Sequence, residues 1–91
     1  MAAPVRRHLW ISGQVQGVFF RDRCQAQARA GGVAGWITNR PDGRVEAVLE
    51  GDPAAVAAVE DWCRHGPRRA VVTHVDAADE APTGATGFDV R

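Results

Sequence analysis

The residues best suited to chemistry lie in one short stretch, residues 13–21, which reads Gly-Gln-Val-Gln-Gly-Val-Phe-Phe-Arg. It lies between a predicted strand and a predicted helix, where backbone N–H groups lack helical partners and the helix dipole adds partial positive charge. Such junctions bind anions, phosphate above all, and glycine at position 17 lets a ligand approach the backbone closely. Arg21 adds a guanidinium whose fixed fork of donors suits phosphate oxygens. The stretch therefore predicts an anion site; the alternative is an ordinary strand–helix connection with a solvated arginine.

Asn39 is the second candidate, because it ends a predicted strand just before a turn. Its side-chain amide can donate to one partner and accept from another, so it can orient a water molecule. Asparagine is also common near turns for its local hydrogen bonds, and a purely structural role is the alternative. In the predicted topology the 13–21 loop and the end of this strand share one edge of the sheet.

The elements that must position these residues follow from apolar periodicity and from turn residues. Alternation of apolar and polar residues predicts strands, and apolar residues at helical spacing predict helices. Asp52 offers a helix N-cap and Pro53 the favoured first helical position. The expected order is a strand at 5–12, a helix at 21–30, strands at 33–39 and 44–50 around a type I turn at 40–43, a helix from 53 to the Gly-Pro stop at 66–67, a strand at 70–77 and a short strand at 87–91.

The same patterns predict which side chains face the core. In the first strand Val5, Leu9 and Ile11 share one face, and in the first helix the small residues Cys24, Ala28 and Ala30 are expected inside. The hairpin of residues 33–50 is expected to bury one face. In the strand at 70–77 we expect Val71 and Val75 on one face and Val72 on the other.

The element order β-α-β-β-α-β, with a short terminal strand added, predicts an α+β fold of the ferredoxin-like sandwich type. Both β-α-β portions favour right-handed crossovers, which put the two helices on one face of a single antiparallel sheet. A chain of 91 residues without a linker or repeat predicts one domain, residues 1–91. This architecture alone decides no activity, since enzymes, metal carriers and RNA-binding modules share it.

Composition limits the partners. Acidic and basic residues balance at 11 each, so no net field attracts the chain to nucleic acid or to an anionic membrane. No segment resembles a secretion signal or a membrane span, which predicts a cytoplasmic protein, and the lack of an exposed apolar stripe predicts a monomer. Cys24 and Cys63 are too far apart for a metal or disulfide signature and read as buried free thiols. The three histidines form no ligand spacing, so neither a metal nor a cofactor is expected.

Two stretches closely resemble the signatures of the acylphosphatase family. Residues 13–21 are similar to its G-x-V-Q-G-V-x-F-R motif, and residues 35–45, Gly-Trp-Ile-Thr-Asn-Arg-Pro-Asp-Gly-Arg-Val, are similar to its G-W-V-x-N-x-x-D-G-x-V motif. Segments at 62–64, 82–84 and 87–88 resemble later landmarks, so the resemblance covers nearly the whole chain. Gly31 departs from it, because many members place a larger apolar residue there. We expect looser packing and a stability cost of up to about 1 kcal/mol relative to alanine.

The resemblance implies an enzyme that hydrolyses a small-molecule acyl phosphate to a carboxylate and inorganic phosphate without a metal. It implies that Arg21 binds the phosphate and that Asn39 positions the attacking water. The backbone N–H groups that would complete the cradle are those of Gln16, Gly17, Val18, Phe19 and Phe20.

Three other functions share the predicted fold. A phosphate-binding domain without turnover differs from an active enzyme only in measured catalysis, although the presence of both Arg21 and Asn39 favours the enzyme. An RNA-binding module would carry aromatic residues in a characteristic central-strand motif, which the sequence lacks. A metal carrier would need closely spaced cysteines or histidines, which it also lacks.

Overall fold

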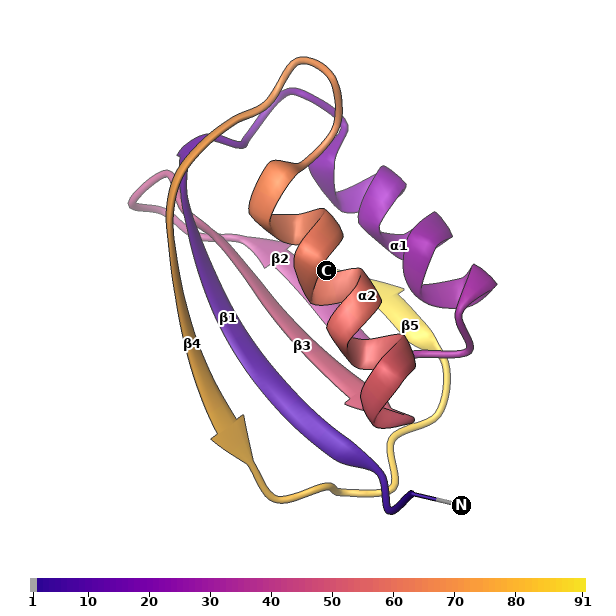
Figure 1. The fold of residues 1–91 in the computed structure, drawn as a ribbon. Helices are drawn as coiled ribbons and strands as arrows, with labels where there is room; N and C mark the ends of the chain where they lie inside the picture. The colour runs from indigo at the N-terminus through magenta and orange to yellow at the C-terminus, as the bar shows by residue number, and fades with distance from the viewer. Residues whose placement is uncertain (1) are drawn as a thin grey trace.

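The computed structural model describes residues 2–91, and the predicted elements occur in the predicted order (Figure 1). The first helix begins one residue earlier than expected, and the strand predicted to end at residue 77 continues to Glu80. Asp52 caps the second helix as predicted, because its carboxylate accepts hydrogen bonds from the backbone N–H groups of Ala54 and Ala55. The elements are β1 (Val5–Gln14), α1 (Phe20–Ala30), β2 (Ala34–Asn39), β3 (Val45–Gly51), α2 (Pro53–His65), β4 (Val71–Glu80) and β5 (Phe88–Val90).

The strands form one sheet in the order β4-β1-β3-β2-β5, and both helices cover the same face of it (Figure 1). The ferredoxin-like α+β fold is confirmed, but the sheet is mixed rather than antiparallel, because β5 pairs with β2 in parallel. The reason lies in the path of the chain. After β4 it crosses the far end of the sheet and returns along the free edge of β2, so β5 runs opposite to β4 and in the direction of β2.

The apolar core fills the layer between the sheet and the helices. Leu9, Ile11, Cys24 and Ala28 are fully buried, as their periodicity predicted. Ala30 is exposed, contrary to expectation. At about 100° per residue, a position two residues beyond the buried Ala28 points away from the sheet.

Strand β4 does not follow the simple alternation predicted for it. Val71 is 52% exposed, whereas Val72 and Val75 both pack against the core. The pairing of β1 with β4 shifts register between Ser12 and Gly13. A β-bulge of this kind adds one residue to one strand and reverses the facing of the residues beyond it.

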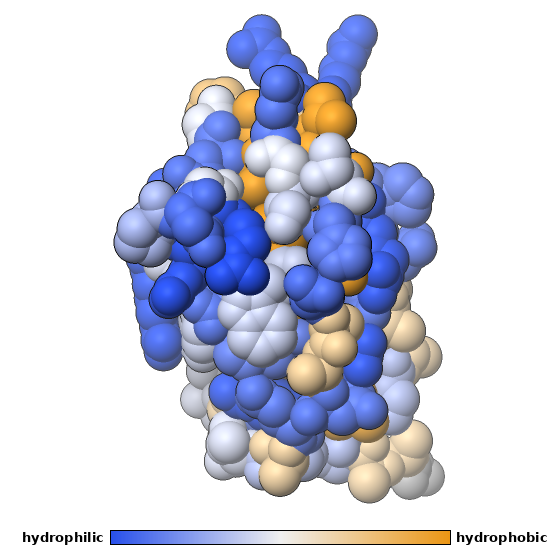
Figure 2. Space-filling view, turned by 90° about the vertical axis from the view of Figure 1, so that its left-hand side faces the viewer, coloured by the Kyte–Doolittle hydropathy of each residue, from blue (hydrophilic) through white to orange (hydrophobic). Residues whose placement is uncertain are grey.

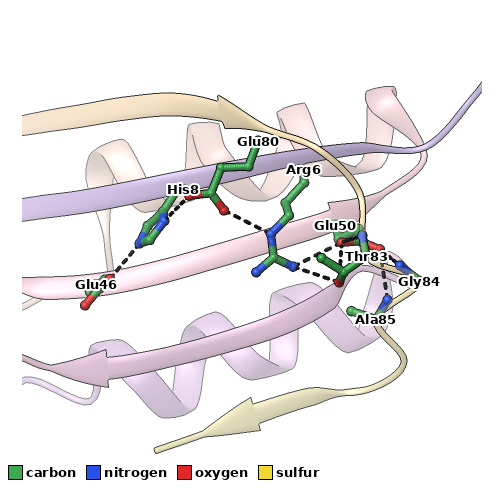
Figure 3. A network of polar contacts seen from close by, with 8 residues as sticks. All are labelled: Arg6, His8, Glu46, Glu50, Glu80, Thr83, Gly84 and Ala85. Atoms are coloured by element: carbon green, nitrogen blue, oxygen red, sulfur yellow. Dashed lines mark hydrogen bonds and ion pairs between the residues drawn. The ribbon is translucent and has the colours of Figure 1, made fainter.

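Strand β3 is buried on both faces, not on one as predicted for the hairpin. It occupies the centre of the sheet, and residues 45–50 are all buried. Its second face, opposite the helices, is covered by a polar network that Figure 3 shows from close by. There the His8 ring nitrogens each lie 2.6 Å from a carboxylate oxygen, of Glu46 and of Glu80, and Arg6 lies 3.0 Å from Glu50 and from Glu80.

The topology gathers several chain ends at one end of the sheet. Strands β1 and β2 each run antiparallel to β3, so both finish at the same end. Gln14 at the end of β1 pairs with Val71 at the start of β4, and β5 runs parallel to β2 and finishes there too. The 13–21 loop, Asn39, the segment before β4 and Arg91 therefore lie toward the same end of the sheet. The loop before α1 and the segment before β4 are seen at the top of Figure 1.

Candidate active site

A cavity of about 270 Å³ lies at this end of the sheet. It contains both side chains that the sequence singled out, Arg21 from the first turn of α1 and Asn39 from the end of β2. The expectation that the loop and the end of the second predicted strand share one edge is confirmed. The remaining lining residues come from the loop and the start of α1: Val15, Gly17, Phe19, Phe20 and Asp22.

The loop holds its backbone in an unusual conformation. Gly17 has φ 73°, and Phe19, the residue before α1, has φ 64° and ψ 24°. Phe19 is the only non-glycine residue among residues 2–91 with a positive φ. This left-handed conformation costs a non-glycine residue about 1–2 kcal/mol, and such strain concentrates at functional sites.

The backbone N–H groups of this loop have no acceptor among the residues that the structure describes. Within residues 2–91, no hydrogen bond from the N–H groups of residues 16–20 to another residue is found, and no side chain caps α1. The first helical hydrogen bond is from the N–H of Arg23 to the carbonyl of Phe19. The loop and the first turn of α1 therefore present a row of free donors at a helix N-terminus, which favours an anion.

Arg21 is held in place by the last residue of the chain. Its Nη1 donates to the backbone carbonyl oxygen of Arg91 at 3.1 Å, and Thr38 donates its hydroxyl to the same oxygen at 3.2 Å. The other guanidinium donors of Arg21 bind no residue of the described chain. This contact with Arg91 could not be predicted from the sequence, because it depends on the parallel pairing of β5 with β2.

Asn39 carries the one buried side-chain oxygen or nitrogen in residues 2–91 that has no hydrogen-bond partner, its Oδ1. A buried acceptor without a partner costs about 1–3 kcal/mol, so native structures rarely keep one unless a ligand or water satisfies it. The atom belongs to a residue that lines the cavity. Asn39 therefore offers a free acceptor beside the donors of the loop.

Two of the predicted cradle residues do not line this cavity with their side chains. Gln16 instead reaches the turn after β2, where its Nε2 donates to the carbonyls of Arg40 at 2.8 Å and Arg44 at 3.0 Å. Val18 lines a neighbouring pocket. The predicted role of both concerns their backbone N–H groups, which belong to the free row described above. Sequence reasoning did not find the side-chain role of Gln16.

The cavity contains few ionisable groups, and the cysteines lie outside it. Arg21 and Asp22 are the only ionisable residues in its lining. Cys24 and Cys63 are free and buried, as predicted, and their Sγ atoms lie 3.7 Å apart in the core between the helices. Hydrogen bonding to Cys24, together with burial, raises the pKa of the Cys63 thiol well above its ordinary value, so Cys63 is a poor nucleophile.

The part of the chain that the structure describes has no group of three or more His, Cys, Asp or Glu side chains able to hold a metal ion. Neither α1 nor α2, the helices of residues 2–91, is long and apolar enough to cross a membrane.

Comparison with known proteins places this geometry in a family. The sequence pattern of the acylphosphatase family matches residues 7–90, and an acylphosphatase of Gloeobacter violaceus is 56% identical over 90 residues, 99% of this chain and 97% of the relative. An acylphosphatase structure from Coxiella burnetii has a TM-score of 0.92 and 32% identity, covering 97% of this chain and 93% of its own. One from Bacillus subtilis has a TM-score of 0.92 and 31% identity, covering 96% and 98%. The chain, with its loop of free donors and its Arg21–Asn39 cavity, belongs to the acylphosphatase family.

Proposed function

We propose which residues of this acylphosphatase bind the phosphate and which residue positions the water during hydrolysis of an acyl phosphate. The enzyme is a hydrolase, and its substrate is a small molecule in which a carboxyl group is joined to phosphate. In the proposal Arg21 and the backbone N–H groups of residues 16–20 bind the phosphate group, and Asn39 positions the attacking water. The observation that carries the proposal is one cavity lined by Arg21, by Asn39 and by Gly17, Phe19 and Phe20 of the loop. The N–H groups of residues 16–20 and the Oδ1 of Asn39 bind no other residue of the described chain.

The cradle stabilises charge on the transferring phosphoryl group. Phosphoryl transfer depends mainly on positioning and on stabilising charge that spreads over the phosphoryl oxygens. Backbone dipoles that are already fixed in place do this without reorganising during the reaction. Arg21 is held by Arg91 on one side, so its remaining donors stay directed as a preformed fork.

Asn39 supplies an acceptor for the water. Its Oδ1 accepts a hydrogen bond from the water that attacks phosphorus, which satisfies the otherwise unpaired buried oxygen. The water oxygen forms a bond to phosphorus while the bond from phosphorus to the acyl oxygen breaks. The bonding electron pair leaves with the carboxylate, and a phosphate oxygen takes the proton of the water.

No side chain is needed as general acid or general base. The parent acid of the leaving carboxylate has a pKa near 4, so the carboxylate departs without a proton. Because a phosphate oxygen accepts the proton from water, a histidine or carboxylate base is also unnecessary. This agrees with a cavity whose ionisable lining is limited to Arg21 and Asp22.

We propose a monomer in the cytoplasm that does not bind nucleic acid. A net charge of zero supports the last point, and two adjacent buried thiols that remain free are typical of a reducing compartment. Light scattering of the purified protein tests whether it is a monomer, and a filter-binding assay with RNA tests whether it binds nucleic acid.

The roles of Arg21 and Asn39 are tested by hydrolysis of benzoyl phosphate with Arg21→Gln and Asn39→Ala variants. We expect kcat/KM to fall about 10³-fold for Arg21→Gln and about 10²-fold for Asn39→Ala, the range found when a charge-stabilising or positioning group is removed. Phosphate binding should be lost in Arg21→Gln and kept in Asn39→Ala.

Arg29→Gln is the matched control for the arginine. Arg29 is an exposed arginine in the last turn of the same helix, outside the cavity. Its substitution should leave kcat/KM within about twofold, since an exposed charge away from the site contributes little. A folded parent that binds phosphate without turnover would instead identify a phosphate-binding domain. Undiminished activity in folded Arg21→Gln or Asn39→Ala would overturn the assigned role.

A further inference from the structure

A second pocket, of about 420 Å³, lies beside the phosphate cradle. Phe19 lines both the cradle cavity and this pocket, and its side chain is 66% exposed. The pocket also contains Val18, Trp62 and three arginines, Arg23, Arg68 and Arg69. Figure 2 shows apolar surface next to long hydrophilic side chains at the upper end of the molecule, the end at which these loops meet in Figure 1.

The three arginines of this pocket have no negative partner. Arg23, Arg68 and Arg69 form no ion pair or side-chain hydrogen bond with any residue of the described chain, and no Asp or Glu lines the pocket. Most arginines elsewhere differ, since Arg6, Arg7, Arg40, Arg44 and Arg64 all pair with carboxylates. The pocket therefore concentrates positive charge that the fold itself does not neutralise.

Packing and a backbone hydrogen bond hold the lining of this pocket in place. The Trp62 and Phe20 rings meet edge to face, 5.3 Å apart, and Gly66 lies so near Phe20 that a Cβ there would stand 2.7 Å from the ring. The turn that carries Arg68 and Arg69 is closed by a hydrogen bond of 2.9 Å from the N–H of Ala70 to the carbonyl of Pro67. The arginines therefore project from a turn that is anchored to the start of α1.

The arginine turn of this pocket and Asn39 lie next to strands on opposite sides of β1. The loop leaves β1, Asn39 ends β2, and the arginine turn leads into β4; in the sheet, β2 and β4 lie on opposite sides of β1. An in-line displacement places the leaving group opposite the attacking water. With water at Asn39, the acyl group leaves toward the flank that carries Phe19 and the arginine turn.

We propose that this pocket binds the acyl portion of the substrate and selects acyl groups that carry a second negative charge, such as a carboxylate. The proposal rests on the roles proposed above for Arg21 and Asn39. Arg23, Arg68 and Arg69 attract the distal anion, while Phe19 and Trp62 contact the carbon skeleton between the two charged ends. The preferred substrates are thus acyl phosphates of dicarboxylic or otherwise anionic acids.

The test compares two acyl phosphates of nearly the same shape, 4-carboxybenzoyl phosphate and its neutral analogue 4-carbamoylbenzoyl phosphate. The readout is the ratio of their kcat/KM values, because this cancels effects common to both. Arg68→Gln, Arg69→Gln and the double variant should lower the ratio, by about threefold for each single substitution, as expected for partly exposed ion pairs. The loss should be in KM and not in kcat, since the contact is present before and during reaction, and added salt should reduce the parent ratio.

Arg29→Gln serves as the matched control, because it removes one exposed positive charge elsewhere on the molecule. Arg29→Gln should leave both the ratio and the benzoyl phosphate turnover near the parent values. If Arg29→Gln lowers the ratio as much as Arg68→Gln does, or if the double variant keeps the parent ratio, the pocket has no role in selection. Absence of benzoyl phosphate hydrolysis in the parent would instead refute the proposed function.

Discussion

At the scale of the single residue, the side chain of Gln16 fixes the phosphate loop to the turn between β2 and β3. It donates two hydrogen bonds, to the carbonyls of Arg40 and Arg44. Asn39 precedes this turn directly. One side chain thus joins the two halves of the site, the loop that presents the donors and the strand end that presents the acceptor.

We predict that Gln16→Met lowers kcat/KM for benzoyl phosphate about tenfold. Methionine keeps the length of the side chain but removes both donors, and small displacements of positioning groups reduce rates strongly. Gln14→Met is the control, since Gln14 is exposed and its side chain has no hydrogen-bond partner in residues 2–91. Steady-state kinetics of both variants measure this. Equal activity in the two would show that the hydrogen bonds from Gln16 have no effect on catalysis.

Some of these residues could be predicted from the sequence and others could not. Arg21 and Asn39 were accessible because each stands at a recognisable junction, a helix start and a strand end before a turn. The side-chain contacts of Gln16 and the carbonyl of Arg91 were not, because they depend on which distant segments meet in space. The pocket arginines Arg68 and Arg69 were missed for the same reason.

At the scale of the element, the two adjacent glycines at the end of α1 have different backbone conformations. Gly31 has φ −90° and ψ 0°, which any residue adopts, and a Cβ there would make ordinary contacts of 3.6 Å or more. Gly32 has φ 68°, in the region that favours glycine. Gly31 lies just beyond the helix, so the expected cost of glycine within a helix does not apply at this position.

We predict that Gly31→Ala raises the free energy of unfolding by about 0.5 kcal/mol, mainly by restricting the unfolded chain. Gly32→Ala should lower it by about 1 kcal/mol, because alanine must adopt a left-handed conformation there. Urea denaturation of the two variants measures both changes. A loss of stability in Gly31→Ala would show that the end of α1 has no room for the added methyl group.

The facing of side chains predicted from the pattern of one strand was wrong where pairing with a neighbouring strand changed it. Period-two alternation put Val71 and Val75 on one face and Val72 on the other, but the register shift opposite Ser12 and Gly13 puts Val72 on the core face with Val75. A bulge depends on the pairing of two strands and leaves little trace in either strand alone. The start of the second helix was predicted accurately because its cap, Asp52, is a local signal.

At the scale of the whole molecule, the element order sufficed to predict the fold, since few topologies satisfy β-α-β-β-α-β with both helices on one face. The direction of β5 and the double-sided burial of β3 were not predictable in the same way. They follow from how the last segment returns to the sheet and from polar side chains that cover its open face (Figure 3). The buried Glu50 of β3 is the centre of that arrangement.

Glu50 joins the open face of the sheet to the loop that leads to β5. Its carboxylate accepts hydrogen bonds from the backbone N–H groups of Thr83, Gly84 and Ala85 at 2.8–3.0 Å, and Arg6 lies 3.0 Å from it. The hydrogen bond from Thr83, with those from Arg6, Ala85 and Gly84, lowers the pKa of Glu50 from 4.5 to about 2 against the opposing effect of burial. The same loop carries the chain to Arg91, which holds Arg21.

The lowered pKa of Glu50 predicts acid sensitivity of the folded state. A carboxylate whose pKa is lower in the folded than in the unfolded state stabilises the fold above the unfolded value, and this contribution is lost as pH falls toward the folded value. We expect Glu50→Gln to lower the free energy of unfolding by about 2 kcal/mol at neutral pH, the range for hydrogen bonds to a charged group. The difference from the parent should shrink as pH falls from 4.5 to about 2. Urea denaturation across this range measures it, with Asp61→Asn, at an exposed position of α2, as the control; a difference that stays constant with pH would show that the charge of Glu50 does not stabilise the fold.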